Sequence, residues 1–252
     1  MKENNAINGL LSAFAPITLE QMSSVKLMNR TDTKFVTNIQ ELEQLLIMAW
    51  QDYYVQEIDG CRNLEYDTTY FDTNDFNMYY THQHGHTNRQ KMRFRTYCVS
   101  GLQFMEIKTK NNHGRTRKKR MEVTNMDLRD EAKRSFIGQH LGYGVDTLQP
   151  VLNNPFSRIT LVNRAKTERL TIDSALRFTN LQSSRQTDMG PLVIVELKRD
   201  GQVWSPVLNM LKQLHIRPHG FSKYCMGSAL TNPALTVNRF KESLHYVEKI
   251  AV

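Results

Sequence analysis

The chain has 252 residues, with 33 Lys and Arg against 25 Asp and Glu, which gives a net charge of +8. The segment from Arg89 to Arg120 alone contains 11 basic residues and one acid, Glu106, so the rest of the chain carries a net charge of −2. A diffuse basic coat for nonspecific adhesion to membranes or nucleic acid is excluded, because its charge would be spread along the sequence. The positive charge is therefore expected to serve one local site.

The composition, 40% hydrophobic and 23% charged, is typical of a globular domain. We expect a loosely ordered segment over residues 1–15 and a single domain over residues 16–252. No apolar run approaches the roughly 18 residues that span a bilayer, and the N-terminus lacks a secretory pattern, so a cytoplasmic location is expected. The odd number and wide spacing of Cys61, Cys98 and Cys225 favour reduced thiols over disulfides or a thiolate zinc site.

In chain order, the sequence predicts a short helix over 19–28, a strand at KFVT, and a helix over 39–50 that Asn38 caps. From Tyr66 to Asp200 the hydrophobic period is two, and strands are predicted over 65–71, 90–99, 102–110, 117–123, 158–167, 169–172, 176–180 and 192–198. Helical patterns return over 127–141, 205–214 and 223–230. Strands at hairpin spacing with few crossover helices between them indicate an α+β fold with a dominant antiparallel sheet or barrel.

The charged residues of these strands fall on one face, because side chains alternate with period two. In RQKMRFRTY, Met92 and Phe94 lie opposite a face that holds Arg89, Lys91, Arg93 and Arg95. The same split recurs in later strands, whose charged faces hold Glu106, Lys108 and Lys110; Lys118, Arg120 and Glu122; Val162, Arg164 and Lys166; Arg169, Thr171 and Asp173; and Ile194, Glu196 and Lys198. For any one strand, a solvated outer face is the simpler interpretation.

The repetition of one sign along most strands favours a second interpretation. In a sheet it would place like charges beside cross-strand neighbours, which is destabilising unless a polyanion neutralises them. If the sheet closes, the charged faces line an interior channel and the apolar faces point outward beneath the helices. Such a channel suits phosphate chains and the metal ions that accompany them.

Seven segments in this order, RTDTKFV, YDTTYFDTNDFNMYY, NRQKMRFRTY, EIKTKNNHGRTRKKR, NRAKTERLTID, VIVELKRDG and RPHGFSKYCMG, follow a known pattern. From about residue 28 to about residue 232, the chain resembles the VTC domain of polyphosphate polymerases, within the triphosphate tunnel metalloenzymes and related to the CYTH proteins. The resemblance implies a tunnel-shaped antiparallel β-barrel that binds ATP and Mg²⁺ or Mn²⁺. It also implies transfer of the γ-phosphoryl group of ATP to a growing polyphosphate chain.

The resemblance also implies roles for particular residues. The expected catalytic wall consists of Arg93, Arg95, Lys108, Arg164 and Lys198. The expected substrate-binding residues are Lys34, Lys91, Lys110, Lys118, Arg120, Arg177, Lys223 and His219. Glu196 matches the metal-binding glutamate, and Glu106 or Asp173 would assist it. Gly220 stands where some relatives carry a second lysine, a role that the adjacent His219 would partly take over.

Two other functions stay open. A tunnel-fold triphosphatase would pass the γ-phosphate to water with nearly the same charged residues, and a non-catalytic module would only bind polyphosphate or another polyanion. Nucleic acid is not expected as a partner, because Phe94 faces away from Arg93 and Arg95 and cannot stack bases beside them. Polymer-synthesising members of the family often work beside membrane proteins, so a membrane-protein partner at the inner face of a membrane stays open, as does the oligomeric state.

The alternating histidines of THQHGHTN, His82, His84 and His86, have two interpretations. Histidines in this pattern can bind a soft metal ion, whereas a polar segment with Gly85 is more often simply exposed. No GxxxxGK[ST] sequence occurs in the chain, which excludes a Walker-type nucleotide site on motif grounds.

Overall fold

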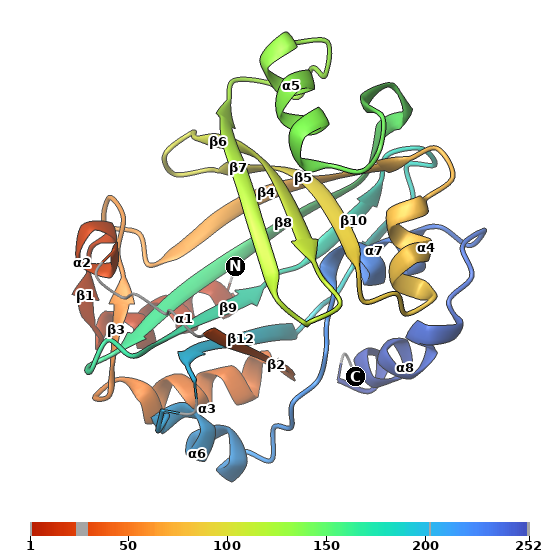
Figure 1. Ribbon diagram of the computed structural model, residues 1–252. Helices are drawn as coiled ribbons and strands as arrows, with labels where there is room; N and C mark the ends of the chain where they lie inside the picture. Colours follow the sequence, from red (N-terminus) through yellow and green to blue (C-terminus); the bar gives the residue numbers. More distant parts are fainter. Residues whose placement is uncertain (1, 24–29, 202, 251–252) are drawn as a thin grey trace.

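The computed structural model describes residues 2–23, 30–201 and 203–250 and contains a single curled sheet (Figure 1). Its main path is antiparallel throughout and runs in the order β2 (Arg30–Asn38), β12 (Leu192–Asp200), β9 (Glu168–Ser174), β8 (Leu148–Asn163), β4 (Asn63–Thr73), β5 (Arg89–Tyr97), β6 (Gln103–Lys110) and β7 (Thr116–Val123). Within the described residues, the end strands β2 and β7 are not paired with each other. The α+β fold with an antiparallel half-barrel confirms the predicted fold class.

Four short strands extend the sheet off this path. They are β1 (Ala15–Ile17), β3 (Tyr53–Gln56), β10 (Arg177–Asn180) and β11 (Gln186–Asp188). The helices are α1 (Lys2–Ser12), α2 (Leu19–Ser23), α3 (Ile39–Ala49), α4 (Asn77–Gln83), α5 (Glu131–His140), α6 (Pro206–Gln213), α7 (Lys223–Thr231) and α8 (Lys241–Ile250). In Figure 1, α3 and α6 lie together at the foot of the molecule, and α4, α7 and α8 lie together on the right.

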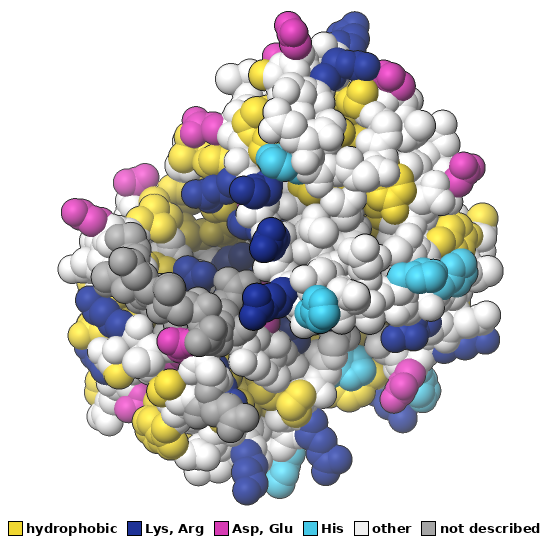
Figure 2. All heavy atoms as spheres, viewed as in Figure 1, with side chains coloured by type: hydrophobic (Ala, Val, Ile, Leu, Met, Phe, Trp, Pro, Cys, Tyr) yellow, Lys and Arg dark blue, Asp and Glu magenta, His cyan; other side chains and the backbone are white. Residues whose placement is uncertain are grey.

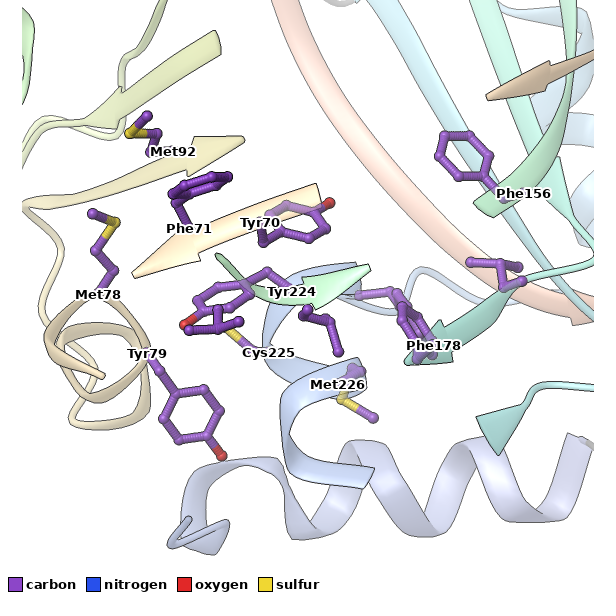
Figure 3. Close-up of a cluster of buried hydrophobic side chains, with 14 of the residues drawn as sticks. Tyr70, Phe71, Met78, Tyr79, Met92, Phe156, Phe178, Tyr224, Cys225 and Met226 are labelled. Atoms are coloured by element: carbon purple, nitrogen blue, oxygen red, sulfur yellow. The ribbon is translucent and has the colours of Figure 1, made fainter. Parts of the chain in front are cut away.

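The hydrophobic core lies between the sheet and these helices, on the outside of the curl. Under α3, one cluster joins Leu45 and Leu46 to Val193, Val195 and Leu197 of β12. A second cluster joins the apolar side chains of β4 and β5 to those of α4 and α7, and Figure 3 shows Phe71, Met78, Met92, Tyr224 and Met226 among its members. Each side chain of this size contributes about 1.5–3 kcal/mol when it is fully buried.

The helix α3 follows the sequence prediction closely. Its N-cap is Asn38, whose side-chain oxygen accepts a hydrogen bond from the backbone N–H of Glu41 at 2.9 Å. The predicted apolar face is buried through Leu42, Leu45 and Leu46. The helix therefore begins where a local capping signal places it, and packing of its apolar stripe holds it against the sheet.

The N-terminal segment differs from the expectation of loose order over residues 1–15. Lys2–Ser12 form α1, and Ile7 and Leu11 are buried at 4% and 1% exposure against the α3 cluster. A helix this short is marginal by itself, so burial of its apolar residues, which composition does not reveal, decides its conformation. The helix predicted over 19–28 is present in its first part as α2, and its remainder, 24–28, lies outside the described residues.

Strand β8 differs most from its predicted bounds of 158–167, because it begins at Leu148 and ends at Asn163. Two prolines obscure the strand pattern in its first half, yet that half pairs with β4. At its end, the Asn163 side chain accepts hydrogen bonds from the backbone N–H groups of Thr167 and Glu168 at 2.8 and 3.0 Å, which closes a tight turn. Arg164 consequently lies in this turn rather than within a strand.

Candidate active site

The inner face of the curled sheet surrounds a cavity of about 780 Å³. Figure 2 shows its opening as a hollow in the surface, with Lys and Arg side chains gathered along one side. Of the residues predicted to form the site, the cavity is lined by Lys34, Lys91, Arg93, Arg95, Lys108, Lys118, Arg120, Lys198, Lys223, Glu106, Asp173 and Glu196. The alternation of the strands thus brings twelve predicted residues from six strands and one helix to a single surface.

A second cavity, of about 1270 Å³, continues from the first. Both are lined by Lys34, Lys91, Lys108 and Glu196. The second cavity adds a dense group of cationic residues, namely Arg89, Lys110, Arg115, Arg117 and Arg239. Because these lining residues are shared, the two cavities adjoin, and we refer to them together as the tunnel, which has a continuous cationic wall.

The middle of the tunnel wall contains a row of three lysines on adjacent strands. Lys91 lies opposite Lys108 in the β5–β6 pair, and Lys108 lies opposite Lys118 in the β6–β7 pair. Burial and the neighbouring cation Lys34 lower the pKa of Lys108 to about 8. Like charges opposite one another destabilise a sheet, so this row has the arrangement expected of a polyanion-binding surface.

Glu106, on β6, is the carboxylate that pairs with two cations of this wall. Its carboxylate accepts from Arg93 Nε at 2.7 Å through Oε2 and from Lys118 Nζ at 2.7 Å through Oε1, and its side chain is only 1% exposed. Burial alone would raise the pKa of Glu106, but Arg93, Arg95 and Lys118 lower it well below its ordinary value. Glu106 is therefore a permanent anion that orients two cations.

Asp173 on β9 has a corresponding role on the opposite wall. Arg158 binds it in a bidentate manner, with Nε–Oδ1 and Nη2–Oδ2 distances of 2.6 and 2.7 Å, and Lys223 Nζ lies 2.7 Å from Oδ2. Burial would raise the pKa of Asp173, but Arg158 and Lys223 lower it far below its ordinary value. The carboxylate thereby holds an arginine and a lysine in fixed positions at the cavity surface.

Sequence reasoning missed Arg158, although its position carried a usable signal. In the predicted strand it falls on the same face as Arg164, six residues earlier. The structure places Arg158 and Thr160 on the cavity wall. The strand therefore contributes Arg158 to the cavity wall, whereas Arg164, which the resemblance assigned to the wall, lies beyond the end of the strand.

The N-terminus of α7 is fixed at the tunnel wall by several hydrogen bonds. Lys34 Nζ donates to the carbonyl of Phe221 at 2.7 Å, and Lys91 Nζ donates to Ser222 Oγ at 2.8 Å. Within the helix, Tyr224 Oη donates to the buried carboxylate of Asp72. These contacts hold Lys223, the first residue of α7, in the cavity.

Glu196 has fewer cationic partners than the other two carboxylates. Lys198 Nζ and Thr171 Oγ1 both donate to its Oε2 atom, the latter at 3.5 Å. Burial would raise the pKa of Glu196, but Lys198 and Lys34 lower it well below its ordinary value. Among the described residues, no three His, Cys, Asp or Glu side chains gather as a metal-binding group. A single carboxylate such as that of Glu196 suits Mg²⁺, which is commonly held by one or two protein carboxylates together with the phosphate oxygens of the substrate.

Three predicted site residues line neither cavity. Arg164 stacks over the ring of Tyr54, with its Cζ 4.2 Å from the ring centroid. Arg177 is exposed on β10, and the His219 ring stacks on Tyr246 at 4.1 Å. Arg164, which was expected in the wall, lies outside it because it belongs to the turn after β8. Arg177 on β10 and His219 beside α8, which were expected to bind substrate, also lie outside both cavities.

The three histidines do not assemble a metal site within the described residues. His82 lines the second cavity, and its Nδ1 lies 2.9 Å from the Sγ atom of Cys225. Burial and the cations Lys91 and Arg89 lower the pKa of His82 to about 2, so the ring is neutral at pH 7. His82 therefore adds no positive charge to the wall of the second cavity at pH 7.

Comparison with known proteins agrees with this architecture. The family model described as the VTC domain matches residues 29–232. The chain belongs to the VTC domain family. Membership of this family makes it a tunnel-fold protein of polyphosphate-related chemistry. No curated protein matches the chain, and no helix in the described part is long and apolar enough to cross a membrane.

Several solved structures are similar to the chain at low sequence identity. HpAC1 from Hippeastrum, for which a dominant triphosphatase activity is described, aligns with a TM-score of 0.51 and 13% identity, over 81% of this chain and 97% of its own. A protein from Bacillus halodurans described as an adenylate cyclase aligns with a TM-score of 0.48 and 14% identity, over 85% of this chain and 100% of its own. One from Vibrio parahaemolyticus with the same description aligns with a TM-score of 0.48 and 12% identity, over 80% and 99%.

Proposed function

We propose that this VTC-domain protein is a polyphosphate polymerase, which transfers the γ-phosphoryl group of ATP to the end of an inorganic polyphosphate chain. The observation that supports the proposal is the continuous cationic wall. It extends from Arg93 and Arg95 in the first cavity, through the Lys91–Lys108–Lys118 row, into the second cavity. A triphosphate alone does not need so long a surface, whereas a polymer does.

The reaction needs positioning and charge neutralisation more than covalent chemistry. The terminal phosphate oxygen of the polymer attacks the γ-phosphorus of ATP, the bond from that phosphorus to the β–γ bridging oxygen breaks, and ADP leaves. The attacking oxygen is already anionic at neutral pH, so no strong general base is required. In this proposal Arg93, Lys108 and Lys198 contact non-bridging oxygens, and the ion pairs with Glu106 and Glu196 hold Arg93 and Lys198 in place.

A divalent cation, Mg²⁺ or Mn²⁺, fits beside Glu196. When bound, the cation would neutralise negative charge on the phosphates of the donor. Glu106 and Asp173 are less suitable ligands, because both oxygens of each already accept from Arg or Lys. We therefore assign the metal to Glu196 and phosphate oxygens, and the other two carboxylates to orienting cations.

The strongest rival is a tunnel-fold triphosphatase, in which water replaces the polymer end as acceptor. The activity described for HpAC1 favours this alternative. A non-catalytic polyphosphate-binding module is the third candidate. The family resemblance also supports a cytoplasmic site of action beside a membrane-protein partner, as part of the same proposal.

Incubation of the purified protein with ATP and Mn²⁺ tests the proposal. We expect ADP and a phosphate polymer that is resolved on a gel, with Glu196→Gln strongly impaired. Lys118→Ala should lower the rate, whereas Lys119→Ala, the neighbour outside both cavities, should not. Inorganic phosphate in place of polymer would assign the protein as a triphosphatase. Binding of polyphosphate without turnover would assign it as a binding module.

A further inference from the structure

The two ends of the tunnel carry different side chains. Along β5 and β6, one end of the inward face holds Arg89 and Lys110, and the other end holds Tyr97 and Phe104. We define the basic mouth as Arg89, Lys110, Arg115, Arg117 and Arg239. We define the apolar mouth as Tyr97, Val99, Leu102 and Phe104.

The apolar mouth exposes hydrophobic surface to the cavity. Leu102 is 44% exposed and Val99 is 38% exposed, although both line the tunnel. The rings of Tyr97 and Phe104 meet edge to face with their centroids 5.7 Å apart. An exposed apolar cluster at a cavity rim is a common feature of ligand sites, and a phosphate chain has no apolar part to cover it.

Arg120 lies beside the apolar mouth. Its guanidinium carbon lies 4.7 Å from the centroid of Phe104, so that an aromatic ring and a planar cation lie together at the rim. Aromatic side chains and guanidinium planes are the surfaces on which nucleobases stack. Phe104 lies four residue steps along β6, or about 13 Å of strand, from Lys108 in the lysine row.

The basic mouth is unsuited to a base. Phe221, Met226 and Phe240 also line the second cavity, but their exposures are only 4%, 1% and 7%. They present little surface to a ligand, and the charged groups around them are mostly Lys and Arg. The two mouths therefore differ in the ligands that they can bind.

We propose that the apolar mouth binds the nucleoside of the phosphoryl donor. This contact would fix the end of the tunnel at which the donor lies and the end at which the polymer lies. The base lies against Phe104, Tyr97 and Leu102, the triphosphate points inward to the lysine row, and the polymer lies toward the basic mouth. This inference rests on the proposed function only in taking ATP as the donor. The apolar mouth is then the specificity-determining site that distinguishes a nucleotide from a bare phosphate chain.

Calorimetric titration with ATP and with inorganic tripolyphosphate, each with Mg²⁺, tests the inference. Phe104→Ala should raise the Kd for ATP about tenfold, the loss expected for one stacked base, and leave the Kd for tripolyphosphate within about twofold. Phe104→Trp should restore ATP binding. Leu102→Ala should weaken ATP binding by a smaller factor, and Leu181→Ala, a residue with 42% exposure outside both cavities, should change neither ligand.

An equal effect on both ligands, or an effect on neither, would overturn the inference. Unchanged binding of tripolyphosphate shows that a variant is folded. If Phe104→Ala loses both ligands through misfolding, the surface variant Leu102→Ala decides between the outcomes by the same comparison of the two ligands. Titration measures binding and does not require turnover. If the protein hydrolyses ATP and makes no polymer, the proposed function is contradicted, but the titrations still test whether the apolar mouth binds the nucleoside.

Discussion

At one end of the β5–β6 hairpin the inward positions hold Arg89 and Lys110, and at the other they hold Tyr97 and Phe104, although the strands and their alternation are the same throughout. The backbone thus decides only that these side chains face the tunnel. Their chemistry decides what each end can bind, which we propose is a polymer of phosphate at one end and a nucleoside at the other. Between the two mouths lies a centre that, in this proposal, contacts both ligands. Substitutions in the basic mouth, the centre and the apolar mouth should therefore have different effects on the binding of the two ligands.

The largest effect is expected in the shared centre, from Arg158→Ala. Removal of this guanidinium leaves Asp173 buried with Lys223 as its remaining ion-pair partner, which costs about 3–5 kcal/mol of folding free energy for a buried pair. Turnover and the affinities for both ATP and tripolyphosphate should fall together by at least about 100-fold. Urea unfolding and parallel titrations measure the two effects. Arg158→Lys is the control, and loss of affinity for one ligand alone would show that the centre is not shared.

A smaller effect is expected at the basic mouth, from the charge reversal of Arg115 and Arg117 to Glu. Affinity for long polyphosphate should fall about tenfold or more at low salt, because repulsion replaces attraction, and the difference should shrink as salt is added. The polymer products should become shorter on gels, while the KM for ATP stays within about twofold. Lys119→Glu, on the same strand as Arg117 but outside both cavities, is the control for charge alone. A rise in the KM for ATP comparable to the loss of polymer affinity would reverse the assignment of the mouths.

The lysine row should make binding depend on pH. Lys108 is charged below its pKa of about 8, and bound phosphate favours the charged form. Affinity for tripolyphosphate should therefore fall as the pH rises from 7 to 9, by up to about tenfold per unit for each lysine that loses its proton. In Lys108→Arg the charge persists across this range, so the slope of log Kd against pH should decrease by about one. An unchanged slope would mean that Lys108 does not titrate in the free protein.

The smallest effect is expected from Arg120→Gln at the apolar mouth. This change removes a cation–π contact at an exposed site, worth about 0.5–1 kcal/mol. We expect a rise of about two- to fivefold in the Kd for ATP and little change for tripolyphosphate, measured by titration. If tripolyphosphate weakens by the same factor, Arg120 contacts phosphate directly, and the nucleoside site depends on Phe104 and Leu102 alone.

The local pattern of the sequence determined which face of each strand carries charge. Period-two alternation placed Arg93, Glu106 and Glu196 inward and Met92 and Val195 outward, and the structure confirms all five positions. A capping signal also located the start of α3 at Asn38. Such features depend on residues two to four positions apart, so they can be predicted without knowledge of the partner strands.

Tertiary structure alone decided which charges meet. Arg158 pairs with Asp173 through the register of β8 and β9, and Lys223 reaches the same carboxylate from α7, fifty residues further along the chain. The turn after Asn163 takes Arg164 out of the wall, and the burial of Ile7 and Leu11 orders α1. The basic and apolar mouths likewise exist only once the strands are aligned. Alternation is a property of one strand, whereas an ion pair or a mouth depends on the register among segments that are distant in sequence.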